Sequence, residues 1–103
     1  MSEWIDVGPA DNITETHPLT TEVDGYAIVV VPCGADFFAV EDRCSHDGES
    51  LAGAEVEACE IICPRHGARF SLRTGDALSP PAYEPIRTFN VRVENGRVLV
   101  EQP

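Results

Sequence analysis

The stretches Cys44-Ser45-His46 and Cys63-Pro64-Arg65-His66-Gly67 are the most informative part of this chain. Each stretch offers one thiolate and one imidazole, close enough in sequence for both to face the same ion. Sixteen residues (47–62) separate the two stretches, so the pattern is C-x-H followed, sixteen residues later, by C-x-x-H. A mixed sulfur and nitrogen donor set suits zinc or an iron–sulfur centre. The pattern therefore predicts a metal site at Cys44, His46, Cys63 and His66, and it leaves the metal open.

The rest of the chain indicates β structure, because short apolar or alternating runs are separated by turn residues. Asp24-Gly25 and Asn95-Gly96 are hairpin signals, the second of them typical of a type I′ turn. A further turn is expected over Pro32–Asp36, and one helical turn near Asp11–Thr16. The expected strands are Thr20–Val23, Ala27–Val31, Phe37–Val40, Ile61–Ile62, Phe89–Glu94 and Arg97–Glu101. This pattern predicts an all-β fold, a small sandwich or barrel.

The chain has 103 residues, which predicts one domain, and 43% of them are hydrophobic, which fits a globular protein. A domain of this size has a modest core. We therefore expect a bound metal centre to stabilise the fold as well as to serve chemistry.

The net charge is −11, from 7 basic and 18 acidic residues. This balance argues against nucleic-acid binding, since phosphate contacts need Lys and Arg. Two interpretations of the charge stay open. It attracts a basic face of a partner protein, or it only keeps a small protein in solution.

The first residues show no signal-peptide pattern, and the longest apolar run, Tyr26–Pro32, is far shorter than a membrane helix. We therefore predict a cytoplasmic protein without membrane association. Disulfides are rare in that compartment. Cys33 and Cys59 are accordingly expected to be small, partly buried apolar residues rather than a disulfide pair.

The two ligand stretches, extended to Cys44–Gly48 and Cys63–Gly67, resemble the cluster-binding boxes of Rieske proteins. Phe70, Thr74-Gly75 and the Pro80-Pro81 segment add to the resemblance, which covers nearly the whole chain. It implies the Rieske-type (ISP-like) fold, with small antiparallel sheets forming a sandwich-like or barrel-like base and a loop-built cluster-binding subdomain. Residues 1–103 would form a single Rieske domain with its cluster-binding part at about 42–82.

The resemblance also implies a ligand set for one Rieske-type [2Fe–2S] cluster. Cys44 and Cys63 would bind the first iron, and His46 and His66 the second. The Pro80-Pro81 segment would form a third loop that shields the cluster.

The function implied by the resemblance is that of a one-electron carrier rather than an enzyme. Such ferredoxins take electrons from a flavin-dependent ferredoxin reductase and pass them to a terminal ring-hydroxylating oxygenase by transient docking. We expect a monomer, although the sequence has no signal of oligomeric state. One alternative is a small Rieske-type subunit of a larger redox enzyme such as nitrite reductase. Another is a structural zinc module, although zinc sites usually pair Cys with Cys and His with His, whereas each box here mixes the two.

The residues around the boxes bear on the reduction potential. In high-potential Rieske proteins of respiratory complexes each box carries an extra Cys, and the two form a disulfide. Glu49 and Arg65 stand at those positions here. A Ser and a Tyr hydroxyl also donate hydrogen bonds in that group, and here those positions are Ala68 and Phe70. Hydrogen bonds to the sulfurs favour the more negative, reduced cluster, so their loss lowers the potential.

We therefore predict a midpoint potential near the low end of the Rieske window, about −150 mV. Electrochemical titration of the purified protein measures it. A midpoint above about +100 mV would show that the missing donors do not govern the potential.

Overall fold

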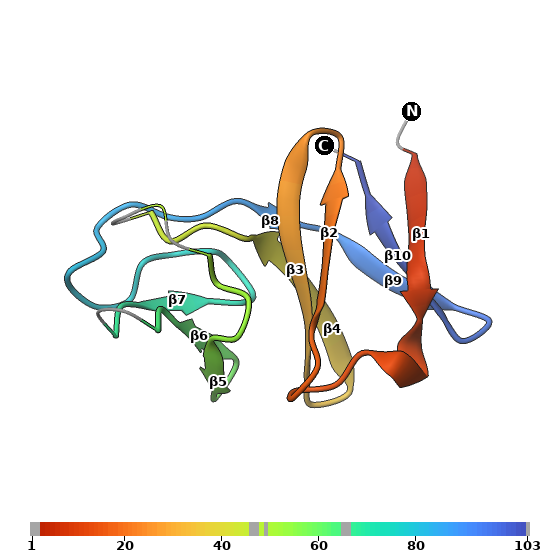
Figure 1. Ribbon diagram of the computed structural model, residues 1–103, viewed down its shortest axis with the longest axis horizontal. Helices are drawn as coiled ribbons and strands as arrows, with labels where there is room; N and C mark the ends of the chain where they lie inside the picture. Colours follow the sequence, from red (N-terminus) through yellow and green to blue (C-terminus); the bar gives the residue numbers. More distant parts are fainter. Residues whose placement is uncertain (1–2, 46–47, 49, 65–66, 103) are drawn as a thin grey trace.

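The computed structural model describes residues 3–45, 48, 50–64 and 67–102. These residues form three antiparallel sheets (Figure 1). The first sheet has the order β1-β10-β9, with β1 at Trp4–Pro9, β9 at Val91–Glu94 and β10 at Arg97–Glu101. The second has the order β2-β3-β4-β8, with β2 at Leu19–Val23, β3 at Tyr26–Cys33, β4 at Asp36–Glu41 and β8 at Thr88–Phe89. The third has the order β5-β6-β7, with β5 at Glu55–Glu57, β6 at Glu60–Ile62 and β7 at Arg69–Ser71.

Strand β3 is buried on both faces, which explains its unbroken β-branched run. Ile28 and Val30 point to one side and Val29 and Val31 to the other, because side chains alternate along a strand. On the first side they join the base core, which lies between the first two sheets and contains Ile13, Val23, Ile28, Val30, Ala39, Phe89, Val98 and Val100. The all-β prediction and the sandwich-like base are confirmed.

The second side of β3 covers the part of the chain that carries the two boxes. This cluster-side core contains Val29, Val31, Val40, Cys44, Leu51, Ile61, Cys63, Ala68, Phe70, Leu72, Ala82 and Ile86. The box-bearing lobe, with β5, β6 and β7, lies beside the base along the longest axis of the molecule (Figure 1). The lobe is thus packed onto the base by apolar side chains of β3 and β4.

The two hairpin turns form as predicted. Asp24 and Gly25 join β2 to β3, and Asn95 and Gly96 join β9 to β10, with all four residues at positive φ. Positive φ at both central residues is the requirement of a type I′ turn. Each turn therefore sets the register of its hairpin locally.

Three local predictions were wrong in detail. β3 continues to Cys33, so the next turn is confined to Gly34 and Ala35. The short helix is a 3-10 turn at Ala10–Asn12, earlier than expected. The run Phe89–Glu94 is not one strand, because Phe89 pairs with Ala39 in the second sheet and Val91 starts β9 in the first. The chain changes sheets at Asn90, a transition that an alternating pattern cannot reveal.

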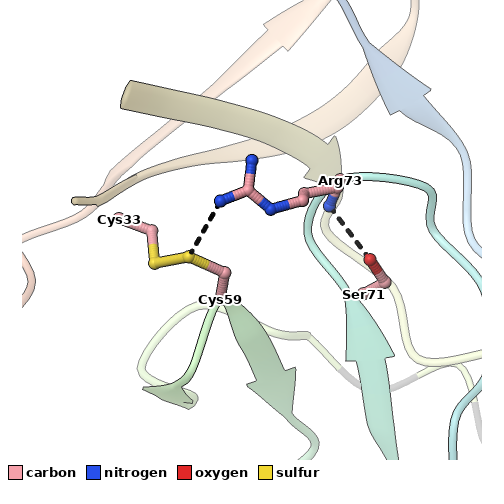
Figure 2. The surroundings of a disulfide bond; sticks show 4 residues. All are labelled: Cys33, Cys59, Ser71 and Arg73. Carbon is pink, nitrogen blue, oxygen red and sulfur yellow. Dashed lines mark hydrogen bonds between the residues drawn. A yellow bond between two sulfur atoms is a disulfide. The ribbon is translucent and has the colours of Figure 1, made fainter. Parts of the chain in front are cut away.

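A disulfide joins Cys33 to Cys59, which corrects the expectation of two separate thiols (Figure 2). Both residues are partly buried against the cluster-side core, as predicted, but their Cα atoms are only 5.7 Å apart. The expectation rested on the reducing cytoplasm, and sequence positions 26 apart gave no hint of contact. Closing a loop of this length stabilises a fold by about 3–4 kcal/mol relative to the reduced unfolded chain.

None of the helical segments among the described residues is long and apolar enough to cross a membrane.

Gly75 lies where the lobe meets the chain that returns to the base. A Cβ at Gly75 would clash with the carbonyl oxygen of Ile86, and φ at Gly75 is +80°. We predict that Gly75→Ala lowers the free energy of unfolding by at least about 2 kcal/mol, through both the clash and the left-handed backbone. Gly96→Ala is the matched control, because its φ is +75° with nothing within 4 Å of the added Cβ. Chemical denaturation of both variants measures the difference, and equal losses would contradict the steric argument.

Candidate metal centre

The second box forms the loop of the β6–β7 hairpin. β6 ends at Ile62, immediately before Cys63, and β7 begins at Arg69. The N–H of Cys63 donates to the carbonyl of Ala68 at 2.7 Å, and the N–H of Gly67 donates to the carbonyl of Cys63 at 3.0 Å. These two bonds close the loop directly on the cysteine backbone.

The first box repeats the same turn after β4. The N–H of Gly48 donates to the carbonyl of Cys44 at 2.8 Å, as that of Gly67 does to Cys63. Gly48 and Gly67 have φ values of +76° and +73°, which only glycine adopts without strain. Two stretches that differ in spacing, C-x-H and C-x-x-H, thus each place cysteine at the start of a five-residue turn closed by the same hydrogen bond.

The two box cysteines are buried and lie outside any disulfide, with exposures of 0% for Cys44 and 1% for Cys63. Both belong to the cluster-side core, so they face its apolar residues rather than solvent. Thiolates are the usual ligands of iron–sulfur clusters. Two reduced thiols held by matching turns, each a few residues before a histidine in sequence, fit such a cluster.

Asp42, which precedes the first box, is hydrogen-bonded to the chain that follows the box. Its Oδ1 accepts hydrogen bonds from the Ser50 hydroxyl at 2.8 Å and from the backbone N–H groups of Leu51 and Ala52 at 2.7 and 3.0 Å. Leu51 is buried in the cluster-side core. One carboxylate therefore closes the whole loop that begins just before Cys44.

The chain around Pro80-Pro81 is tied to the first box and to β7, the strand that follows the second box. The Ser45 hydroxyl donates to the carbonyl of Glu84 at 2.6 Å, and the N–H of Arg69 donates to Ser79 Oγ at 3.1 Å. Ala82 is buried between these anchors. The expectation that this segment forms a third loop shielding the cluster stays a prediction.

Ala68 and Phe70, the positions without hydroxyl groups, are both fully buried in the cluster-side core. Phe70 also pairs with Ile61 across the β6–β7 hairpin. Their side chains therefore contribute packing to the lobe and offer no hydroxyl donor, as the sequence analysis assumed.

Several predicted site residues lie outside the described residues. These are the two histidines of the ligand set, His46 and His66, and the residues at the extra-cysteine positions of high-potential proteins, Glu49 and Arg65. Of the predicted ligand set, the structure therefore describes Cys44 and Cys63 and the backbone that carries them.

Residues 3–90 of the chain match the Rieske [2Fe–2S] domain. The chain belongs to this family. Its members bind the cluster named in the family description, so the match decides what the donor set left open: the cofactor is a Rieske-type [2Fe–2S] cluster and not zinc. The Rieske-type fold class predicted from the boxes is confirmed with it.

Similar proteins are ferredoxin components of oxygenase systems. The chain is 39% identical over 96 residues to the 3-phenylpropionate/cinnamic acid dioxygenase ferredoxin subunit of Escherichia coli K12, covering 92% of this chain and 90% of that protein. It superposes with a TM-score of 0.90 and 31% identity on the ferredoxin of carbazole 1,9a-dioxygenase from Nocardioides aromaticivorans IC177, covering 97% and 98% of the two chains. A chain in the solved complex of reduced oxygenase and oxidized ferredoxin of carbazole 1,9a-dioxygenase matches with a TM-score of 0.85 and 32% identity, covering 94% of this chain and 91% of that one.

The sequence analysis missed Asp42 and Ser45 as supports of the Rieske centre. Asp42 stands two residues before Cys44, but its partners lie eight to ten residues further on. Ser45 was visible only as the spacer of the first box, and its partner, Glu84, is 39 residues away. The one available signal was the position of Asp42 and Ser45 close to predicted ligands. The sequence did not show the partners of either side chain, because those partners lie far along the chain.

We predict that Asp42→Ala reduces the iron and acid-labile sulfide retained per chain and lowers the free energy of unfolding by about 1–3 kcal/mol. The part-buried backbone N–H of Leu51 would lose its acceptor, whereas the N–H of Ala52 keeps the Ser50 Oγ at 3.1 Å. Asp42→Asn is the matched control, since its amide oxygen can still accept those bonds. Metal analysis and denaturation measure both effects. Equal iron retention in the alanine variant and the wild type would show that the carboxylate does not support the centre.

Proposed function

We propose that this protein is the ferredoxin component of a ring-hydroxylating oxygenase system. It would take one electron at a time from a flavin-dependent ferredoxin reductase and pass it to a terminal oxygenase. The observation that carries the proposal is full-length similarity to such ferredoxins, one of them in a complex with its oxygenase. The matched chain of that complex has nearly the length of this one, so the similarity is to the ferredoxin.

The ligands proposed for the cluster are Cys44 and Cys63 for one iron and His46 and His66 for the other. When bound, the cluster supplies a reversible one-electron acceptor whose two neutral imidazole ligands raise its potential above that of all-cysteine ferredoxins. The proposal includes the expected organisation, a single domain over residues 1–103 with its cluster-binding part at about 42–82.

The chain's own residues hold the thiol ligands and keep water from them. The matching turns place the two cysteine side chains in the cluster-side core, where Leu51 and Phe70 are fully buried beside them. Asp42 and Ser45 hold the first box against the rest of the lobe. These contacts create a rigid site, which suits electron transfer because little has to rearrange when charge is added.

The related proteins are named as ferredoxins of dioxygenase systems, which supports a role in electron transfer rather than in catalysis. Docking to two successive partners requires transient complexes. The net charge of −11 supports this through attraction to basic partner faces, which speeds encounter and weakens with salt. We propose a cytoplasmic monomer for the same role. None of these observations favours a permanent subunit of a nitrite reductase.

We predict a rhombic electron paramagnetic resonance signal from the dithionite-reduced protein, with an average g value well below that of the free electron and with iron equal to acid-labile sulfide. His46→Ala and His66→Ala should each abolish this signal. His17→Ala is the matched control, because His17 lies outside both boxes and its Nδ1 is hydrogen-bonded with the neighbouring Thr16 hydroxyl at 3.1 Å. A full Rieske signal in either box variant would exclude that histidine as a ligand.

The same samples test the rival explanations. Stoichiometric zinc without a signal would remove the electron-carrier proposal, and co-purification with a large redox subunit would favour the permanent-subunit alternative.

A further inference from the structure

The Cys33–Cys59 disulfide connects two parts of the fold that share no strand pairing. Cys33 is the last residue of β3 in the base, and Cys59 lies in the turn between β5 and β6 of the box-bearing lobe (Figure 2). Among the described residues, the β5-β6-β7 sheet is not hydrogen-bonded to either of the other sheets. The bond is therefore a covalent link between base and lobe, in addition to the main chain and the cluster-side core.

Cys59 also holds the open end of the hairpin that presents the second box. It directly precedes β6, whose far end leads into Cys63 about 13 Å away along an extended chain. Its carbonyl accepts the N–H of Leu72 at 3.0 Å, immediately after β7. Both strands that flank the second box are thus anchored at Cys59, so a change at this residue reaches the ligand loop through one short hairpin.

The disulfide lies where thiol chemistry can reach it. Both cysteines are partly exposed, and Nη2 of Arg73 lies 3.8 Å from Cys59 Sγ (Figure 2). The Arg73 guanidinium is held over the Phe38 ring at 5.1 Å, and the Arg73 N–H donates to Ser71 Oγ at 3.2 Å. Asp36 lines the same surface hollow as Arg73 and Phe38. A guanidinium beside a sulfur stabilises that sulfur as a departing thiolate.

We propose that Cys33 and Cys59 form a second redox site, a thiol–disulfide exchange site for a dithiol reductant, whose state sets how firmly the second cluster-binding box is held. A thiolate of the dithiol attacks Cys33 Sγ, the S–S bond breaks, and Cys59 leaves as a thiolate beside Arg73. The second thiol of the reductant then attacks the mixed disulfide and releases Cys33. Two electrons and two protons pass to the pair, and the dithiol becomes a disulfide.

The biological use of this site rests on the proposed cytoplasmic function. Disulfides in a reducing cytoplasm are mostly transient, catalytic or redox-sensing. Reduction should loosen the lobe without unfolding it, because the cluster-side core, against which both cysteines pack, stays in place. The pair would thus make cluster retention depend on the thiol state of the cell.

The test uses the cluster-loaded protein under anaerobic conditions, with dithiothreitol as the dithiol. Mass spectrometry after alkylation follows Cys33 and Cys59, and absorbance with a ferrous chelator follows iron release. We expect the pair to become alkylatable before the cluster is lost, and iron release to become at least about threefold faster through more frequent local opening. The Cys33→Ser/Cys59→Ser double variant should release iron at the faster rate with or without dithiothreitol, which separates loosening from chelation by the reagent.

Arg73→Gln tests the leaving-group role. It should slow reduction of the pair about three- to tenfold while leaving the cluster spectrum unchanged. Equal reduction rates would overturn the role assigned to Arg73.

Three results would overturn the proposal: a pair that is reduced only when the protein unfolds, a chain isolated with both thiols reduced and not oxidisable, or a reduced pair with unchanged iron release. Alkylation and iron release can be measured on folded wild-type protein treated with dithiothreitol, so the test does not depend on whether the double variant folds. An absent Rieske signal would instead defeat the proposed function and leave the alkylation result intact.

Discussion

The burial of β3 on both faces is the constraint on which the rest of the structure depends. Ile28 and Val30 fill the base core, while Val29 and Val31 cover the box-bearing lobe. A strand with only one apolar face would support the sandwich and leave the lobe without an apolar surface to pack on. Because each fully buried side chain of this size contributes about 1.5–3 kcal/mol, these four residues join the two halves of the molecule into one folding unit.

The box-bearing lobe holds two thiols firmly in a small, loop-rich region. It does so by repeating one backbone turn, closed from Gly48 to Cys44 and from Gly67 to Cys63. Hydrogen bonds over longer range, from Asp42 and Ser45, then fix the first box to the surrounding chain. The site is thus built mainly from backbone geometry, and the cysteine that begins each turn lies in the cluster-side core.

The four cysteines divide into two pairs with different chemistry. Cys44 and Cys63 are buried, lie outside disulfides and are the two cysteines proposed as cluster ligands. Cys33 and Cys59 are partly exposed and bonded to each other, with a guanidinium beside one sulfur. The predicted compartment gave the wrong redox state for Cys33 and Cys59. A compartment sets the average redox state of thiols, whereas the local geometry decides whether two particular thiols come close enough to form a disulfide.

The sequence by itself determined the fold class, the hairpins at Asp24-Gly25 and Asn95-Gly96, the two boxes and through them the family. These features are local: turn chemistry, alternation and ligand spacing act within a few residues of each other. Only the tertiary structure decided the change of sheet at Asn90, the anchoring of the first box by Asp42 and Ser45, and the pairing of Cys33 with Cys59. The physical reason is the same in each case. These contacts join residues whose approach depends on how the lobe packs against β3, and no local pattern encodes that packing.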